Sequence, residues 1–107
     1  MKELRPTLWR TCRVLSNPVR LDLIRLLLSN GKGTVADLAA SAHLAKGVAS
    51  ASLRAINARG LAKAIPQGRY VFYSPEPNPG VEHADEILLA LNNAFQAGLD
   101  NEAIVRA

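Results

Sequence analysis

The chain has 107 residues, of which 49% are apolar, and this length is enough for one compact domain but not for two. No apolar run approaches the roughly 20 residues that span a bilayer, and the start MKELRPTLWR lacks the apolar core of a secretion signal. We therefore expect a cytoplasmic protein with no membrane partner. The single cysteine, Cys12, excludes an internal disulfide and any metal cage built from several cysteines of one chain.

Charge is distributed unevenly along the chain. Residues 1–74 hold twelve Lys and Arg against three Asp and Glu, a net +9, whereas residues 75–107 hold one against six, a net −5. A polyanion-binding body followed by a separate self-association or ligand-binding element would have this distribution. A solvated surface whose sign varies by accident would have it too, so charge alone leaves both interpretations open.

Two helices are predicted before residue 31. The segment after Pro6 carries one apolar stripe at helical spacing, formed by Leu4, Leu8, Cys12 and Leu15. A second helix is expected to follow Ser16-Asn17-Pro18, which combines a capping residue with a proline suited to a first helical turn. It runs to Asn30-Gly31, and Gly31-Lys32-Gly33 is predicted to be a turn.

A short helix and a longer helix are predicted next, separated by a brief turn. Thr34 followed by Asp37 resembles a capping box, and it starts a helix from Val35 to about Ala42. The longer helix runs to about Arg59, where Gly60 provides a left-handed cap. This order is that of a helix-turn-helix motif.

The remainder of the chain predicts a hairpin, a connector and a last helix. Residues 61–65 and 69–74 are rich in β-branched and aromatic residues, and Pro66-Gln67-Gly68 reverses the chain between them. Three prolines at positions 75, 77 and 79 form a stiff connector. A last helix, which stops near Gly98, is marked by Ala84, Ile87, Leu88, Leu91 and Phe95. Residues 1–98 are expected to form one domain, and 99–107 a tail that either frays or adds one turn.

The longer helix also carries a polar stripe. At about 100° per residue, a sector of about 80° contains Lys46, Ser50, Arg54 and Asn57. Lysine suits phosphate or guanine, small residues admit close approach, and arginine and asparagine donate to base edges or backbone. An ordinary solvated helix face fits the same stripe. Arg69 beside Gly68 at the hairpin tip is placed to reach a minor groove or phosphate, although an arginine in a turn is usually only solvated.

Four segments, in this order and spacing, resemble the ArsR family of bacterial winged-helix repressors: LSNPVRLDLIRLLL, TVADLAASAHL, LRAINARGLAKA and QGRYVFYS. The similarity covers roughly Leu8 to Phe95, and LSNPVR and GRYVFYS are its most specific parts. It implies a mainly α-helical winged helix-turn-helix with a small β-hairpin wing, and a homodimer formed through the first and last helices. It also implies two copies of the helix Ala45–Arg59 in successive major grooves of a promoter palindrome, and release of DNA on an inducing signal.

The resemblance and the polar stripe together give a set of candidate residues. The expected contacts with double-stranded DNA come from Lys46, Gly47, Ser50, Arg54, Asn57, Gln67 and Arg69. The expected dimer interface includes Leu4, Leu8, Cys12, Leu88, Leu91 and Phe95. No catalytic carboxylate pair, Gly-rich phosphate loop or nucleophile paired with histidine is recognisable, so we do not expect an enzyme. The alternatives are a winged-helix module that binds protein instead of DNA, and a DNA-bound sensor of an organic ligand.

The chain departs from the metal-sensing members that it resembles. Those members place a Cys-x-Cys pair at the start of the third helix, where this chain has Thr34 and Ala36. A second family site needs ligands at both ends of the last helix, and here His83, Asp85 and Glu86 are followed only by Asn92, Asn93 and Gln96. We therefore expect no metal and no other cofactor. The alternative is a weakly held metal between two His83 side chains of a dimer, in place of a solvated acidic cluster at a helix start.

Two further residues have two interpretations each, and two others depart from the family pattern. A lone Cys12 is expected to be a buried or interface hydrophobe, and the alternative is a reactive thiol. His43 is expected to cap a helix, in preference to contacting phosphate. Ala45 occupies a position where the family commonly has a serine cap, and Ala51 one where a bulky polar residue is common. Base readout is therefore expected to be thin, with DNA shape and backbone contacts contributing more.

Overall fold

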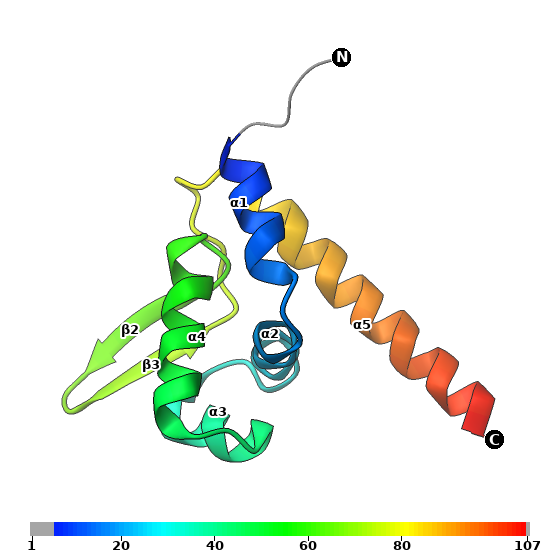
Figure 1. Cartoon of the computed structure of the whole chain (residues 1–107), viewed down its shortest axis with the longest axis horizontal. Helices are drawn as coiled ribbons and strands as arrows, with labels where there is room; N and C mark the ends of the chain where they lie inside the picture. Colours follow the sequence, from blue (N-terminus) through cyan, green and yellow to red (C-terminus); the bar gives the residue numbers. More distant parts are fainter. Residues whose placement is uncertain (1–5, 107) are drawn as a thin grey trace.

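The computed structural model describes the backbone of residues 6–106 and the side chains of residues 9–98. Figure 1 shows five helices and a small sheet. Their order along the chain is α1 (Pro6–Leu15), α2 (Pro18–Asn30), β1 (Gly33–Thr34), α3 (Val35–Ala42), α4 (Lys46–Ala58), β2 (Lys63–Gln67), β3 (Tyr70–Ser74) and α5 (Ala84–Arg106). The predicted mainly α-helical fold with a hairpin wing is confirmed.

The junction between α1 and α2 explains the segment LSNPVR. The Asn17 side chain accepts hydrogen bonds from the backbone N–H groups of Val19 (2.9 Å) and Arg20 (3.2 Å), and so caps α2 as predicted. The Arg20 Nε donates to the carbonyl of Val14 at 2.6 Å. This bond satisfies an otherwise free carbonyl in the last turn of α1. The segment therefore fixes both the end of one helix and the start of the next.

The sheet has three antiparallel strands in the order β1-β3-β2. Gly33 pairs with Tyr73 and Thr34 with Phe72, so the expectation that residues 31–33 are only a turn was wrong at Gly33. Sequence analysis did not predict β1, because this strand is only two residues long and its partner lies about 40 residues further along the chain. The strand β1 fastens the start of α3 to the base of the hairpin.

The ends of α3 and α4 follow the sequence closely. Thr34 accepts a hydrogen bond from the Asp37 N–H (3.1 Å), which confirms the predicted start of α3. His43 ends α3 in a left-handed conformation, with φ 57°, and confirms its capping role. Gly60 ends α4 with φ 75°, and a Cβ there would lie 2.6 Å from the Cβ of Val81. Glycine is therefore required by both backbone conformation and space.

The hairpin turn begins two residues later than predicted and ends one residue later. Gln67 pairs with Tyr70, so the connection is Gly68-Arg69, and Pro66 lies inside β2 opposite Val71. Gly68 has φ 60°, which suits the first central position of a two-residue hairpin turn. Proline is tolerated within β2 because β2 is the edge strand of the sheet.

The core lies between α2, α3, α4 and the base of the wing. Its fully buried large side chains include Leu23, Ile24, Leu27, Leu53, Ile56 and Leu61. The first half of α5, from Ala84 to Phe95, packs on the core, and the rest of α5 runs away from the body (Figure 1). The helix continues to Arg106 and does not stop near Gly98. None of the described helices has the length and hydropathy needed to cross a membrane.

Candidate nucleic-acid interface

The outward face of α4 is polar and open. Its inward residues Ala49, Leu53 and Ile56 have no exposed surface and hold the helix against the core. On the other side Lys46, Gly47 and Arg54 are exposed, and Ser50 is half-buried. The structure therefore brings four of the predicted contact residues onto accessible surface of one helix.

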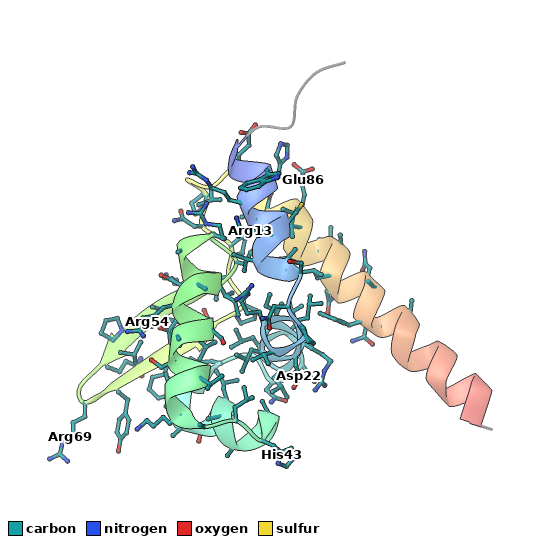
Figure 2. The ribbon with its side chains drawn as sticks, viewed as in Figure 1. Arg13, Asp22, His43, Arg54, Arg69 and Glu86 are labelled. Carbon is teal, nitrogen blue, oxygen red and sulfur yellow. The ribbon has the colours of Figure 1, made fainter. Side chains whose placement is uncertain are left out.

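The cations of α4 and of the wing tip are not balanced by carboxylates of the described residues. No Asp or Glu occurs in residues 38–75, a segment that holds five Lys and Arg. Among the residues with described side chains, none forms an ion pair with Lys46, Arg54 or Arg69. Figure 2 shows Arg54 on the side of α4 that carries the hairpin, and Arg69 extending from the hairpin tip. The two elements present cations that have no partner within the described chain.

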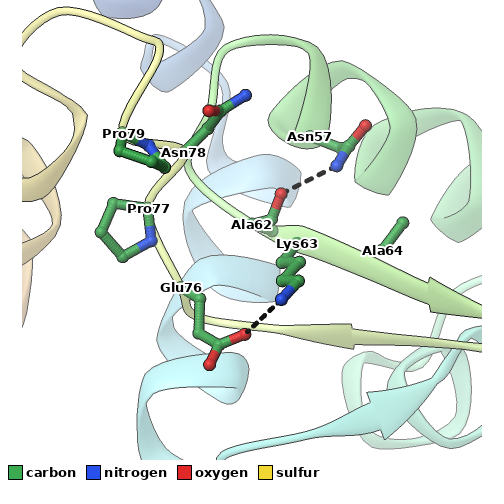
Figure 3. Close-up of a pocket in the computed structure, with 8 residues that line it drawn as sticks. All are labelled: Asn57, Ala62, Lys63, Ala64, Glu76, Pro77, Asn78 and Pro79. Carbon is green, nitrogen blue, oxygen red and sulfur yellow. Dashed lines mark hydrogen bonds and ion pairs between the residues drawn. The ribbon is translucent and has the colours of Figure 1, made fainter.

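Asn57 differs from the other members of the polar stripe. It is half-buried, and its Nδ2 donates to the carbonyl of Ala62 at 2.8 Å (Figure 3). The donor that was expected to reach a base edge therefore holds the hairpin base against the end of α4. Helical spacing predicted that Asn57 lies on the same stripe as Lys46 and Arg54. It could not show that the segment after Gly60 folds back and places the Ala62 carbonyl beside Asn57.

Asn57 also lines a depression of about 560 Å³ between α4, β2 and the proline-rich connector (Figure 3). Its two charged residues, Lys63 and Glu76, lie 4.0 Å apart and balance each other. The Asn78 N–H donates to the carbonyl of Gly60 at 2.9 Å, which fastens the connector to the end of α4. The depression has no unbalanced charge among its lining residues, and we assign it a structural role.

The N-terminus of α4 lacks a side-chain cap. Ala45 occupies the cap position and forms no side-chain hydrogen bond, as predicted from its methyl side chain. The first turn of a helix presents N–H groups that have no partner within the helix. Because residues 45–48 are all exposed, these groups are accessible from outside. The helix dipole and Lys46 both favour an anion at this end.

The wing tip is accessible as well. Gln67, Gly68 and Arg69 are all exposed, in agreement with their predicted placement at the end of the hairpin. Since the sheet joins the base of the hairpin to α3 and α4, the tip is the part of the wing furthest from the core (Figure 1). The tip and the start of α4 therefore form two separate polar contact points.

Comparison with solved structures identifies the architecture. No protein-family model matches the chain, and no curated protein matches it. The antimony-specific transcriptional repressor AntR has a TM-score of 0.70 at 20% identity, over 96% of this chain and 98% of that one. The homodimeric winged helix-turn-helix DNA-binding domain of Mb0332 from Mycobacterium bovis, a possible ArsR-family regulator, has a TM-score of 0.67 at 24% identity. The match covers 94% of this chain and 91% of that one. The ArsR family regulator RHA00566 has 0.63 at 20%, over the whole of both chains.

The chain has the winged helix-turn-helix fold of ArsR-family regulators. In this fold α3 and α4 are the two helices of the helix-turn-helix, and β2 and β3 are the wing. The resemblance seen in the sequence is thus confirmed for the fold. All three neighbours are regulators of transcription or their DNA-binding domains.

Three apolar residues of the winged helix-turn-helix surface were missed by sequence analysis. Val48 in the first turn of α4 is 48% exposed, and Tyr70 and Val71 on β3 are 61% and 40% exposed. At about 100° per residue Val48 lies roughly 160° around α4 from both Lys46 and Ser50, so it stands outside the polar stripe. It was passed over because only polar residues were considered.

The predicted dimer residues of this winged helix-turn-helix fall into three groups. The side chains of Leu4 and Leu8 lie outside the described residues. Leu88 is only 5% exposed and belongs to the core of its own chain, so its assignment to an interface was wrong. Leu91 and Phe95 are half-buried against the same core.

Cys12 and two other residues remain on open surface. Cys12 is exposed, because α1 turns the neighbouring Thr11 inward, so the expectation of a cysteine buried within the chain was wrong. An interface role or a reactive thiol for Cys12 stays a prediction. Leu89 and Trp9, which sequence analysis did not select, are 62% and 50% exposed.

The acidic start of α5 does not assemble a metal site within the described chain. His83 has φ 66°, and its ring nitrogens lie 3.2 Å from Glu86 Oε1 and 3.4 Å from Glu82 Oε1. No group of three or more His, Cys, Asp or Glu among the described residues is arranged to hold a metal ion. The contacts of His83 fit a cluster that closes the turn before α5, and binding of a metal between two chains stays untested.

Proposed function

We propose that this winged helix-turn-helix protein is an ArsR-family transcriptional repressor that binds a promoter palindrome as a homodimer. In this proposal α4 enters the major groove and the wing contacts an adjacent phosphate or minor groove. An inducing signal, whose identity the sequence does not give, releases the DNA. The single observation that carries the proposal is the basic character of residues 38–75, with Lys46, Arg54 and Arg69 exposed and without a carboxylate partner among the described side chains.

The contacts divide into positioning and reading. Lys46 and the uncapped N–H groups of α4 suit a phosphate, and Arg69 suits a second phosphate or a narrow minor groove. Arg54 and Ser50 are the residues left to read base edges. Arg54 favours guanine, and the small Ser50 admits close approach of the helix. Only a few side chains then discriminate bases, which supports the expectation that DNA shape contributes to specificity.

Dimerisation supplies the second half-site. Two α4 helices must lie about 34–36 Å apart to enter successive major grooves on one face of the duplex. The exposed Leu89 on α5 and the exposed Trp9 and Cys12 on α1 suit the contact of α1 and α5 with a second copy. The homodimeric state of the neighbour Mb0332 supports this arrangement.

Selection of bound sites from random duplexes tests the proposal directly. We expect a recovered palindrome, and we expect Lys46→Ala and Arg54→Ala each to weaken its binding by about 1–3 kcal/mol. Arg25→Gln is the matched control, because it removes the same charge from α2, outside α4 and the wing. Its Asp22 pair is part-exposed and contributes little to stability.

Salt dependence separates the repressor from a protein-binding module of the same fold. Lys46 and Arg69 from each of two chains would neutralise about four phosphates, which gives a slope of log K against log salt of roughly −4. A weak slope, or unchanged affinity in both Lys46→Ala and Arg54→Ala, would contradict DNA binding through α4. The protein-interaction alternative would then be favoured.

A further inference from the structure

A second basic region lies away from the reading face. A depression of about 320 Å³ is lined by one aromatic residue, one aliphatic residue and four arginines: Trp9, Arg10, Arg13, Val14, Arg20 and Arg59. They come from α1, from the start of α2 and from the residue that follows α4. The depression therefore forms where three helices meet.

The four arginines of this depression form no ion pair with a described carboxylate. Arg20 is held by the Val14 carbonyl at 2.6 Å, and Arg13 lies over the Trp9 ring at 5.6 Å from its centroid. Guanidinium groups that line one depression without a counter-charge repel one another. An anion bound among them would remove this repulsion and accept several charge-assisted hydrogen bonds.

The position of the depression favours a small ligand over the DNA duplex. Arg59 follows the last turn of α4, whereas Lys46 begins the helix, and 13 residues at about 1.5 Å each separate them by about 20 Å. Figure 2 shows Arg13 on α1, far from Arg69 at the wing tip. A concave site with an aromatic wall also encloses a small molecule better than it follows a phosphate backbone.

We propose that this arginine pocket binds a multivalent oxyanion, such as a phosphate compound or a polycarboxylate, and that its occupancy alters the position of α4. Arginine forms paired hydrogen bonds with both phosphate and carboxylate, so both sources share the recognised chemistry. Because Arg59 adjoins the end of α4, a ligand that draws it toward α1 and α2 acts on the helix that reads DNA. The regulatory part rests on the proposed function, and the binding part does not.

The only tryptophan of the chain reports on the pocket. Trp9 is 50% exposed in its wall, so titration of the full-length protein with pyrophosphate, and separately with citrate, is followed by tryptophan fluorescence without DNA. Sodium chloride at matched ionic strength provides the reference. We expect a saturable change with at least one of the two probes. A response that does not differ from the chloride reference with either probe would overturn the proposal.

Substitutions of the pocket arginines test whether the probe binds in the pocket. Arg59→Gln and Arg10→Gln should each weaken binding of the responding probe at least about tenfold, since each removes a charged hydrogen bond. The control Lys63→Gln removes the same charge from the edge strand and should leave the response unchanged. Circular dichroism checks that each variant is folded, and isothermal calorimetry repeats the titration independently of Trp9. Equal binding by the parent and both arginine variants would place the probe elsewhere and refute the pocket.

A third measurement tests the coupling to DNA. With a selected duplex, a saturating probe should change the affinity of the parent by about fivefold or more and that of Arg59→Gln much less. If the probe does not change the affinity of the parent protein for the duplex, the coupling is refuted, but the proposed binding site is not. If Arg59→Gln binds the probe normally and loses salt dependence, the pocket is a DNA-backbone contact. If it loses only dimerisation, the occupant is an acidic segment of the second copy, and both outcomes overturn the proposal.

Discussion

The apolar side chains of α4 are buried more completely than those of α5. On α4, Ala49, Leu53 and Ile56 are completely buried, and the open face is mainly polar. On α5, Ala84 and Leu88 reach the core in the first two turns, but Leu89 remains 62% exposed. Figure 1 shows the later part of α5 extending away from the body, at a distance from α4.

A single chain buries the whole apolar face of α4, but it leaves part of the apolar surface of α5 exposed. The core fixes α4 on one side, so its outward face is free to bind a ligand of opposite charge. The helix α5 spans 23 residues, about 35 Å, and its part from Ala84 to Phe95 packs on the core, whereas the rest extends beyond it (Figure 1). An apolar face of this kind on a small domain suits a partner helix. We infer that α4 is built to face DNA and α5 to face a second copy.

The largest expected effect comes from Leu88. Replacing it by alanine removes a core side chain, and the free energy of unfolding should fall by about 2–5 kcal/mol. Urea unfolding at several protein concentrations measures this. The loss should be the same at every concentration, because Leu88 packs within its own chain. If the decrease in the free energy of unfolding disappeared at low protein concentration, Leu88 would belong to the dimer interface after all.

Leu89, one residue later, should act on assembly. Leu89→Asp places two carboxylates in a twofold contact, and we expect a folded monomer whose affinity for the palindrome falls at least about a hundredfold. Sedimentation gives the assembly state and a binding titration gives the affinity. Ala90→Asp, which adds the same charge at the next exposed position, is the control. A Leu89→Asp dimer that binds DNA normally would exclude this face of α5 from the interface.

Asn57 sharpens the distinction between the two ends of α4. Asn57→Ala removes the hydrogen bond to the Ala62 carbonyl, so the free energy of unfolding should fall by about 0.5–1.5 kcal/mol. Duplex affinity, corrected for the folded fraction, should change little. Arg54→Ala should have the opposite profile, with normal unfolding and weak binding. If Asn57→Ala lost affinity and kept its stability, the amide would be a base contact after all.

The smallest effect concerns the cap of α4. Ala45→Asp should raise the free energy of unfolding by about 0.5–1 kcal/mol, because aspartate caps the helix and suits its dipole. It should nevertheless weaken DNA binding, since its charge repels a phosphate at the same place. Ala45→Asn provides a neutral cap and should stabilise the fold with less loss of affinity. Thermal unfolding and duplex titration of the two variants decide this, and equal affinities would place the phosphate elsewhere.

Local signals predicted most of the fold. The caps at Asn17, Thr34 and Gly60 act between residues close in sequence, so the helix boundaries they set could be read directly. The wing was predicted as a hairpin for the same reason. Its turn was misplaced because proline usually marks a turn, whereas Pro66 lies within an edge strand, where its missing N–H is tolerated.

Features that depend on distant chain segments could not be read in this way. The choice between Leu88 and Leu89 as the buried residue depends on how α5 packs on α2, since both belong to one apolar helix. The contact between Asn57 and Ala62 requires the chain to fold back after Gly60. The arginine pocket joins residues 9–20 to Arg59, which no local pattern connects. The candidate DNA residues were predicted as a group, but their individual roles depended on the fold.

The proline in the wing has a consequence for solubility. Gln67 and Tyr70 close the two-residue turn as a hydrogen-bonded pair, so the next pair, Pro66 and Val71, is a non-hydrogen-bonded one, and the nitrogen of Pro66 faces away from β3. A strand arriving from another molecule would need a donor at that point and would find none. The wing therefore presents exposed Tyr70 and Val71 without offering a complete edge for β-aggregation. Replacing Pro66 by threonine would restore the donor and open that edge to intermolecular pairing.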